Sequence, residues 1–242
     1  MPLEQNLILT QYFHSLFGHA NFEGLKTLLR NCGEERDEEG VSKFCRRLET
    51  GGGLQLTQEA LHAYDARIGE IEDELRRYRG DFKNLRYFQY LALLYTEIFL
   101  DRLTSNPEGF AAELTEFAAS RPGIGDVQPF RPEGLRRLAF FMATGSGKTL
   151  LLHLNLRQIW HYLKNGAHPE GLVKRRDGRR EFDQILLITP SAALSEQHRR
   201  ELRESGLDAK LLIEDREGGD GRLWPRVKVV EIHKLAEDVS GD

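Results

Sequence analysis

The sequence predicts an α/β fold, in which a domain built on a parallel sheet follows a helical N-terminal region. Three observations predict it. Residues 1–134 carry apolar side chains at helical spacing. Residues 138–163 combine an apolar run, a glycine-containing turn and a second helical pattern. After them, short apolar runs alternate with another helical stretch, the order expected of a doubly wound sheet with right-handed crossovers. We therefore divide the chain into regions 1–134 and 135–242.

Composition sets broad limits on the protein. A chain of 242 residues with 40% hydrophobic content can bury a sizeable core in one large or two small domains. It has no run of about 18 apolar residues and no signal-peptide pattern, so we expect a cytoplasmic protein without a membrane partner. The net charge is −4, but residues 1–134 have 15 Lys and Arg against 22 Asp and Glu, whereas residues 135–242 have 19 against 16. Any nucleic-acid surface is therefore expected mainly in the second half.

The chain has two cysteines, Cys32 and Cys45. Neither belongs to a spacing pattern typical of a metal site. In a cytosolic protein we expect reduced thiols in preference to a disulfide.

The first region is predicted to be helical throughout. Asn21 is a candidate cap between two short helices, and the glycines at 51–53 mark a loop. One apolar stripe has the alternating spacing 3, 4, 3, 4, 3 that follows one face of a helix. Its members are Leu61, Tyr64, Ile68, Ile71, Leu75 and Tyr78. The helices that these patterns predict after the first two span about 41–48, 57–79, 82–103 and 107–120.

The pattern at the centre of the chain predicts a phosphate-binding loop between a buried strand and a helix. The strand is predicted at Leu138–Met142 and the helix at 150–163. Gly145 and Gly147 allow the backbone to curl so that N–H groups point at a polyphosphate near the positive end of the helix dipole. Lys148 would neutralise the phosphates, and the Thr149 hydroxyl would bind Mg²⁺.

The remaining elements follow the order of a parallel sheet. Strands are predicted at 184–188, 209–213 and 227–232, and a helix at 191–205. A basic cluster precedes the first of these strands. It could follow a nucleic-acid backbone, or it could be an ordinary solvated loop. Its members are Lys174, Arg175, Arg176, Arg179 and Arg180.

Two segments together resemble one family. The segment Met-Ala-Thr-Gly-Ser-Gly-Lys-Thr at 142–149 resembles motif I of superfamily 2 helicases, especially the branch that contains the restriction subunit of type III restriction enzymes. The segment Thr-Pro-Ser-Ala-Ala-Leu-Ser-Glu-Gln at 189–197 resembles motif Ia of the same superfamily. The resemblance implies a partial RecA-like P-loop domain with ATP and Mg²⁺ as cofactors.

The resemblance also implies roles for individual residues. Lys148 and Thr149 would be the catalytic residues, and Thr149 would be the metal ligand. Thr189, Pro190 and Ser191 would contact a nucleic-acid backbone, with DNA favoured over RNA. A capped helix without any ligand is the plainer interpretation of that second segment. The residues that would bind ATP are Ala143, Thr144, Gly145, Ser146, Gly147, Lys148, Thr149 and Gln89.

Gln89 enters this set through a weaker match. Leu-Arg-Tyr-Phe-Gln at 85–89 resembles the motif in which a glutamine amide reads the adenine edge upstream of motif I. Gln89 precedes Lys148 by 59 residues, which is further than usual. Gln128 has the more usual spacing but lacks the Leu-Arg and aromatic context. A polar residue on a packed helix is the competing interpretation of Gln89.

One feature of the family is missing from the sequence. Superfamily 2 helicases hydrolyse ATP with an Asp-Glu pair, the Walker B acids, on a later strand, and no Asp-Glu pair follows Lys148. Glu214 and Asp215 stand in reversed order and too early to fill this role. The resemblance thus implies an N-terminal segment of a longer enzyme, truncated before Walker B, with little hydrolysis alone. A downstream or partner polypeptide would supply the acids and the second RecA-like lobe.

Three functions remain open from the sequence. The first is the ATP-binding segment of a DNA helicase or translocase. The second is a nucleotide-dependent interaction module that a partner chain completes. The third is a small-molecule kinase with the same loop, which the match at 190–197 argues against.

Overall fold

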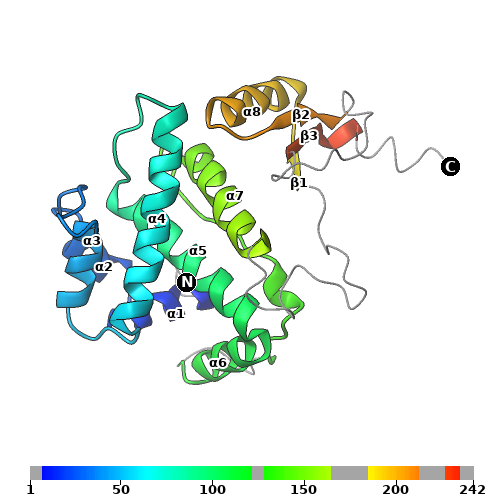
Figure 1. Cartoon of the computed structure of the whole chain (residues 1–242). Helices are drawn as coiled ribbons and strands as arrows, with labels where there is room; N and C mark the ends of the chain where they lie inside the picture. The colour runs from blue at the N-terminus through cyan, green and yellow to red at the C-terminus, as the bar shows by residue number, and fades with distance from the viewer. Residues whose placement is uncertain (1–6, 122–127, 165–184, 213–226, 235–242) are drawn as a thin grey trace. The chain divides into compact units, whose positions relative to one another are not determined.

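The computed structural model describes residues 7–121, 128–164, 185–212 and 227–234 (Figure 1). Helices dominate, and a small parallel sheet accompanies them. The chain forms two compact units: one contains Met1–Glu72 and Lys83–Leu172, and the other contains Asp73–Phe82 and Val173–Asp242. The structure therefore confirms a mixed helical and parallel-sheet protein.

The first unit is built from helices. The long helix α4 begins there and ends in the second unit. A single turn of 3-10 helix at Gly134–Arg136 follows the last helix of the N-terminal region. The bounds are α1 Ile8–Leu16, α2 Phe22–Leu29, α3 Lys43–Thr50, α4 Gln58–Tyr78, α5 Tyr87–Ser105, α6 Pro107–Ala119 and α7 Lys148–Lys164.

Local sequence signals explain where several helices begin and which faces they bury. The side chain of Asn21 accepts a hydrogen bond of 3.2 Å from the Gly24 N–H and so caps α2, as predicted. On α4, Leu61, Ile68 and Leu75 are fully buried, which confirms the apolar stripe over most of its length. The prediction is wrong for its last member, Tyr78, which is 59% exposed at the end of the helix.

Helix α5 begins at Tyr87, five residues later than predicted. The reason is a side-chain contact at its start. The Gln89 Oε1 atom accepts a hydrogen bond of 3.0 Å from the Arg86 N–H, which satisfies a backbone donor in front of the first turn. Leu85, just outside the helix, is buried.

Helix α7 packs against α5 through a buried polar cluster around Glu97. The Glu97 carboxylate accepts hydrogen bonds of 2.8 Å from Gln158 and from Tyr162, both on α7. Arg67 on α4 pairs with the same carboxylate at 2.8 Å. The helix that carries the predicted phosphate loop is therefore fixed to two helices of the N-terminal region.

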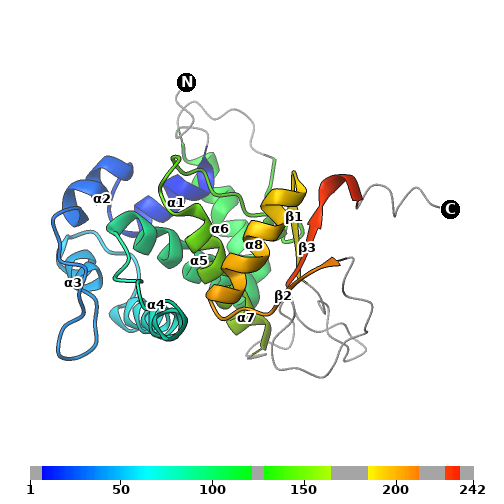
Figure 2. The same ribbon diagram turned by 90° about the horizontal axis from the view of Figure 1, so that it is seen from above.

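The second unit contains a three-stranded parallel sheet in the order β1-β3-β2 (Figure 2). Its strands are β1 Ile185–Thr189, β2 Ala209–Leu211 and β3 Val227–Glu231. Val227 is aligned with Ile185 on one side and with Ala209 on the other. Helix α8, Ala192–Glu204, connects β1 to β2 and packs on the sheet. The predicted parallel pairing of these strands is confirmed.

The strand predicted at Leu138–Met142 is wrong. This segment forms neither strand nor helix, and the side chains of Phe140 and Phe141 are 41% and 63% exposed. An apolar run becomes a strand only where a neighbouring strand offers backbone partners. Across the described ranges, all the strands of the sheet come from residues 185–231, and the segment 138–142 is not among them.

In the parts of the chain that the structure describes, no helix combines the length and the apolar character needed to span a bilayer.

Candidate nucleotide-binding site

The candidate site is the turn 142–149, which leads directly into α7. Gly145 and Gly147 have φ values of +78° and +84°, a backbone conformation that residues with a side chain rarely adopt. Within the turn, the Ser146 N–H and the Ser146 hydroxyl both donate to the Ala143 carbonyl, at 3.3 and 2.7 Å. The glycines therefore stand where the turn requires left-handed backbone.

Lys148 is the first residue of α7, and its side chain folds back over the turn. Its Nζ atom donates hydrogen bonds to the carbonyls of Met142 at 3.2 Å and of Ala143 at 2.9 Å. Both acceptors are neutral backbone groups on an exposed part of the chain. An anion held in the turn would offer this ammonium a stronger, charge-assisted partner.

The turn is accessible, as a ligand would require. Ala143, Thr144 and Gly145 are exposed, and a Cβ atom placed on Gly145 would meet no atom within 4 Å. Thr149 lies half-buried in the first turn of α7. At this end of a 17-residue helix, unpaired N–H groups and the helix dipole favour negative charge. The residues present thus fit a polyphosphate.

Gln89 lies against this turn, although 57 residues separate it from Ser146. Its Nε2 atom donates a hydrogen bond of 3.1 Å to the Ser146 carbonyl, while its Oε1 atom caps α5 at Arg86. A Cβ atom on Gly147 would stand 2.6 Å from the same Nε2 atom. The side chain of Gln89 therefore supports the turn through its hydrogen bond to the Ser146 carbonyl. Gln128, the other candidate for reading adenine, is exposed.

This supporting contact is the functional feature that the sequence did not reveal. The sequence predicts that the Gln89 amide contacts adenine, whereas in the structure both ends of this amide bind the backbone. The spacing of three residues between Arg86 and Gln89 is the local signal of the capping contact. No local pattern indicates the contact with Ser146.

The predicted nucleic-acid residues lie in the second unit, where β1 ends and α8 begins. Ser191 caps α8 by accepting a hydrogen bond of 3.4 Å from the Leu194 N–H. The hydroxyl of Thr189 is buried and shares a hydrogen bond of 2.6 Å with the Ser195 hydroxyl. Pro190 is exposed. Thr189 therefore holds the strand-to-helix turn together, while Pro190 and the first turn of α8 face solvent.

Two further sets of predicted residues lie outside the described residues. They are the basic cluster, residues 174–180, and the reversed acidic pair, Glu214 and Asp215.

Comparisons of this chain with protein-family models, with curated proteins and with solved structures found no match.

Proposed function

We propose that this chain is an ATP-binding segment of a DNA helicase or translocase of the type III restriction-like branch. The observation that supports it best is the turn 142–149: two glycines with positive φ values, followed by a lysine at the start of a long helix, on an exposed surface. This combination is what a polyphosphate site needs, because backbone N–H groups, a helix dipole and an ammonium act on the same anion.

In the proposed complex, the N–H groups of Gly145, Gly147 and Lys148 hold the phosphates, while the Ser146 N–H stays bound to the Ala143 carbonyl. The Lys148 ammonium leaves the Met142 and Ala143 carbonyls and pairs with the phosphate oxygens, and the Thr149 hydroxyl contributes an oxygen to Mg²⁺. Gln89 stabilises the conformation of the turn through its hydrogen bond to the Ser146 carbonyl. Since no Asp-Glu pair follows Lys148 in the sequence, we expect the chain alone to hydrolyse little ATP.

The nucleic-acid backbone is proposed to bind at the N-terminus of α8. The exposed Ala192 and Ala193 offer the first N–H groups of the helix, and the exposed Pro190 leaves the approach open. Ser191 caps the helix, and Thr189 positions the turn without contacting the ligand.

The test is a titration with a fluorescent ATP analogue and Mg²⁺. Lys148→Ala should weaken binding at least about tenfold, because it removes the charge-assisted contact with the phosphates. Lys26→Ala is a matched control, since it removes the same charge from an exposed pair with Glu23 on α2. Equal affinity of the wild type and the folded Lys148→Ala variant would refute the assignment of the site.

A second candidate, the interaction module completed by a partner chain, is supported by the sheet. Strand β1 lies at the edge of the described sheet, with Leu186 and Ile188 about half exposed. An exposed apolar edge strand is a usual place for another strand to add. ATP turnover that appears only when a second polypeptide with an Asp-Glu strand is added, and that Ile188→Lys abolishes, would favour this function over the first.

A further inference from the structure

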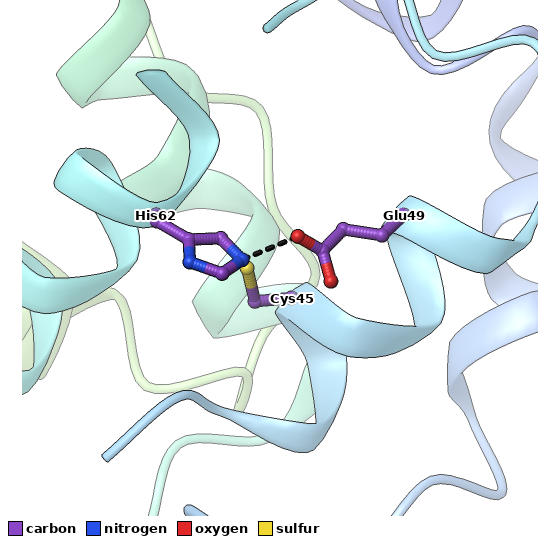
Figure 3. Close-up of side chains that lie close together, drawn as sticks. All are labelled: Cys45, Glu49 and His62. Carbon is purple, nitrogen blue, oxygen red and sulfur yellow. Dashed lines mark hydrogen bonds and ion pairs between the residues drawn. The ribbon is translucent and has the colours of Figure 1, made fainter. Parts of the chain in front are cut away.

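Three side chains of metal-binding type come together between α3 and α4, well separated in sequence from the turn 142–149. They are Cys45, Glu49 and His62, and their ligand atoms all lie within 4.8 Å of one another (Figure 3). Cys45 and Glu49 are four residues apart on α3 and so share one face of that helix. His62 comes from the second turn of α4 and points at them. We propose that these three residues form a binding site for a divalent ion of the zinc class.

The donor set indicates which kind of ion would bind. A thiolate, an imidazole and a carboxylate are the ligands that Zn²⁺ takes in proteins, whereas Mg²⁺ and Ca²⁺ prefer oxygen alone. With the thiolate and the carboxylate ionised and the imidazole neutral, the ligands carry two negative charges, which balance a divalent cation. Three protein ligands leave the fourth tetrahedral position to solvent. The His62 side chain is 36% exposed, whereas Cys45 is fully buried, so the His62 side of the cluster is the one nearer to solvent.

The geometry requires only a small rearrangement. With metal–ligand distances of about 2.0–2.3 Å, the ligand atoms of a tetrahedral site are separated by roughly 3.4–3.6 Å. The Glu49 carboxylate and the His62 Nε2 atom are in direct contact, so an ion between them would push these two atoms apart by about 1 Å. Cys45 lies within 4.8 Å of both and would approach by at most about 1.4 Å, and changes of side-chain torsion can supply both movements.

The surroundings hold the ligands in place. Ser42 caps α3, and its hydroxyl accepts a hydrogen bond of 3.0 Å from the Cys45 N–H. Cys45 is fully buried, and Glu49 keeps only 8% of its side chain exposed. Arg46 stands 3.7 Å from Glu49 but is also bound by Asp37 at 2.8 Å. Glu49 therefore shares the Arg46 guanidinium with Asp37, which lies closer to it, and the nearest group to the Glu49 carboxylate is the proposed fellow ligand His62.

Without a bound metal ion, the Cys45 thiol has low reactivity. Burial, and then the nearby carboxylates of Asp65 and Glu49, raise the pKa of Cys45 well above its ordinary value. A thiol in this state is a poor nucleophile, which argues against a redox or catalytic role. A cation between the three ligands would favour the thiolate, because it supplies the positive charge that the site lacks.

The experiment uses Co²⁺ as the probe, added to the full chain kept reduced with a phosphine. We expect one ion per chain, a thiolate-to-cobalt charge-transfer band, and displacement of that band by Zn²⁺. Cys45→Ser should abolish the band. His62→Gln should weaken binding at least about tenfold, since even the loss of an outer-shell partner costs that much. Cys32→Ser is the matched control, because Cys32 lies outside the cluster and should leave the band unchanged.

Circular dichroism of each variant shows whether it is folded. If Cys45→Ser does not fold, the cobalt affinity of His62→Gln is the deciding measurement, because His62 is more exposed than Cys45. Failure to see a thiolate band at saturating cobalt would overturn the proposal. A band that disappears in Cys32→Ser and persists in Cys45→Ser would overturn it as well. After either result, Glu49 and His62 would form only a hydrogen-bonded pair beside the buried thiol of Cys45.

Discussion

The two glycines of the turn 142–149, Gly145 and Gly147, have the same backbone conformation but different surroundings. Both have positive φ, so a side chain at either position is strained. Around Gly145 a Cβ atom would meet open space, whereas at Gly147 it would meet the Gln89 Nε2 atom at 2.6 Å. Gln89 is a flexible side chain, so it would move away and lose its hydrogen bond to the Ser146 carbonyl.

This difference gives a prediction at the level of single residues. Gly147→Ala should lower the free energy of unfolding by about 1 kcal/mol more than Gly145→Ala, the usual net value of one hydrogen bond. In a Gln89→Ala background, the two substitutions should cost the same. Urea denaturation of the five variants and the wild type measures this. A difference that persists without the Gln89 side chain would show that Gln89 does not support the turn.

Cys45 and His62 illustrate another residue-scale effect, because neither is informative alone. Each is a common residue on a helix, and only their approach to Glu49 suggests chemistry. The spacing of the two cysteines along the chain matches no metal-binding pattern, and so predicts no metal site. The structure supplies the third ligand from a different helix.

Among the elements, α7 depends on Glu97 for its position against α5. The Glu97 side chain is fully buried, and burial raises its pKa to about 7, against the lowering effect of Tyr162, Arg67 and Gln158. In the unfolded chain the carboxyl has an ordinary pKa of about 4.3. Between these values the native state binds more protons than the unfolded state, so stability falls as pH rises through this interval.

The wild type should therefore lose more of its free energy of unfolding between about pH 5 and pH 7.5 than Glu97→Gln does. We expect the difference to reach at least about 1 kcal/mol, because one pKa unit corresponds to 1.36 kcal/mol. Urea denaturation across this pH range is the measurement. Glu116→Gln, which changes an exposed glutamate on α6, is the control and should follow the wild type. Parallel profiles for the wild type and Glu97→Gln would contradict the prediction.

The whole molecule carries a net charge of −4, which does not favour a nucleic acid in general. In the proposed interface at α8, backbone N–H groups hold the phosphates, and few cations take part. Affinity for single-stranded DNA should therefore depend weakly on salt. We expect log K to fall with log salt with a slope of about −1, since each neutralised phosphate contributes about −0.7 on a single strand.

Fluorescence anisotropy with a labelled oligonucleotide, measured across a range of salt concentrations, tests this expectation. A slope near −3.5 would mean that about five cations bind the strand. That result would assign the interaction to the basic cluster, residues 174–180, instead of the N-terminus of α8.

The sequence by itself determined those features that neighbours along the chain control. The cap at Asn21, the buried stripe of α4 and the left-handed glycines of the turn 142–149 all follow from residues close to one another along the chain. The parallel strands of the second unit were also predictable, because their apolar runs alternate with a helical pattern.

Only the tertiary structure decided the rest. The apolar run 138–142 looks like a strand, but a strand exists only with a partner, and pairing is not a local property. The contact of Gln89 with Ser146 and the approach of His62 to Cys45 likewise join residues that are distant in sequence. Such contacts depend on how helices pack, and the sequence pattern of one helix does not specify which face of another it meets.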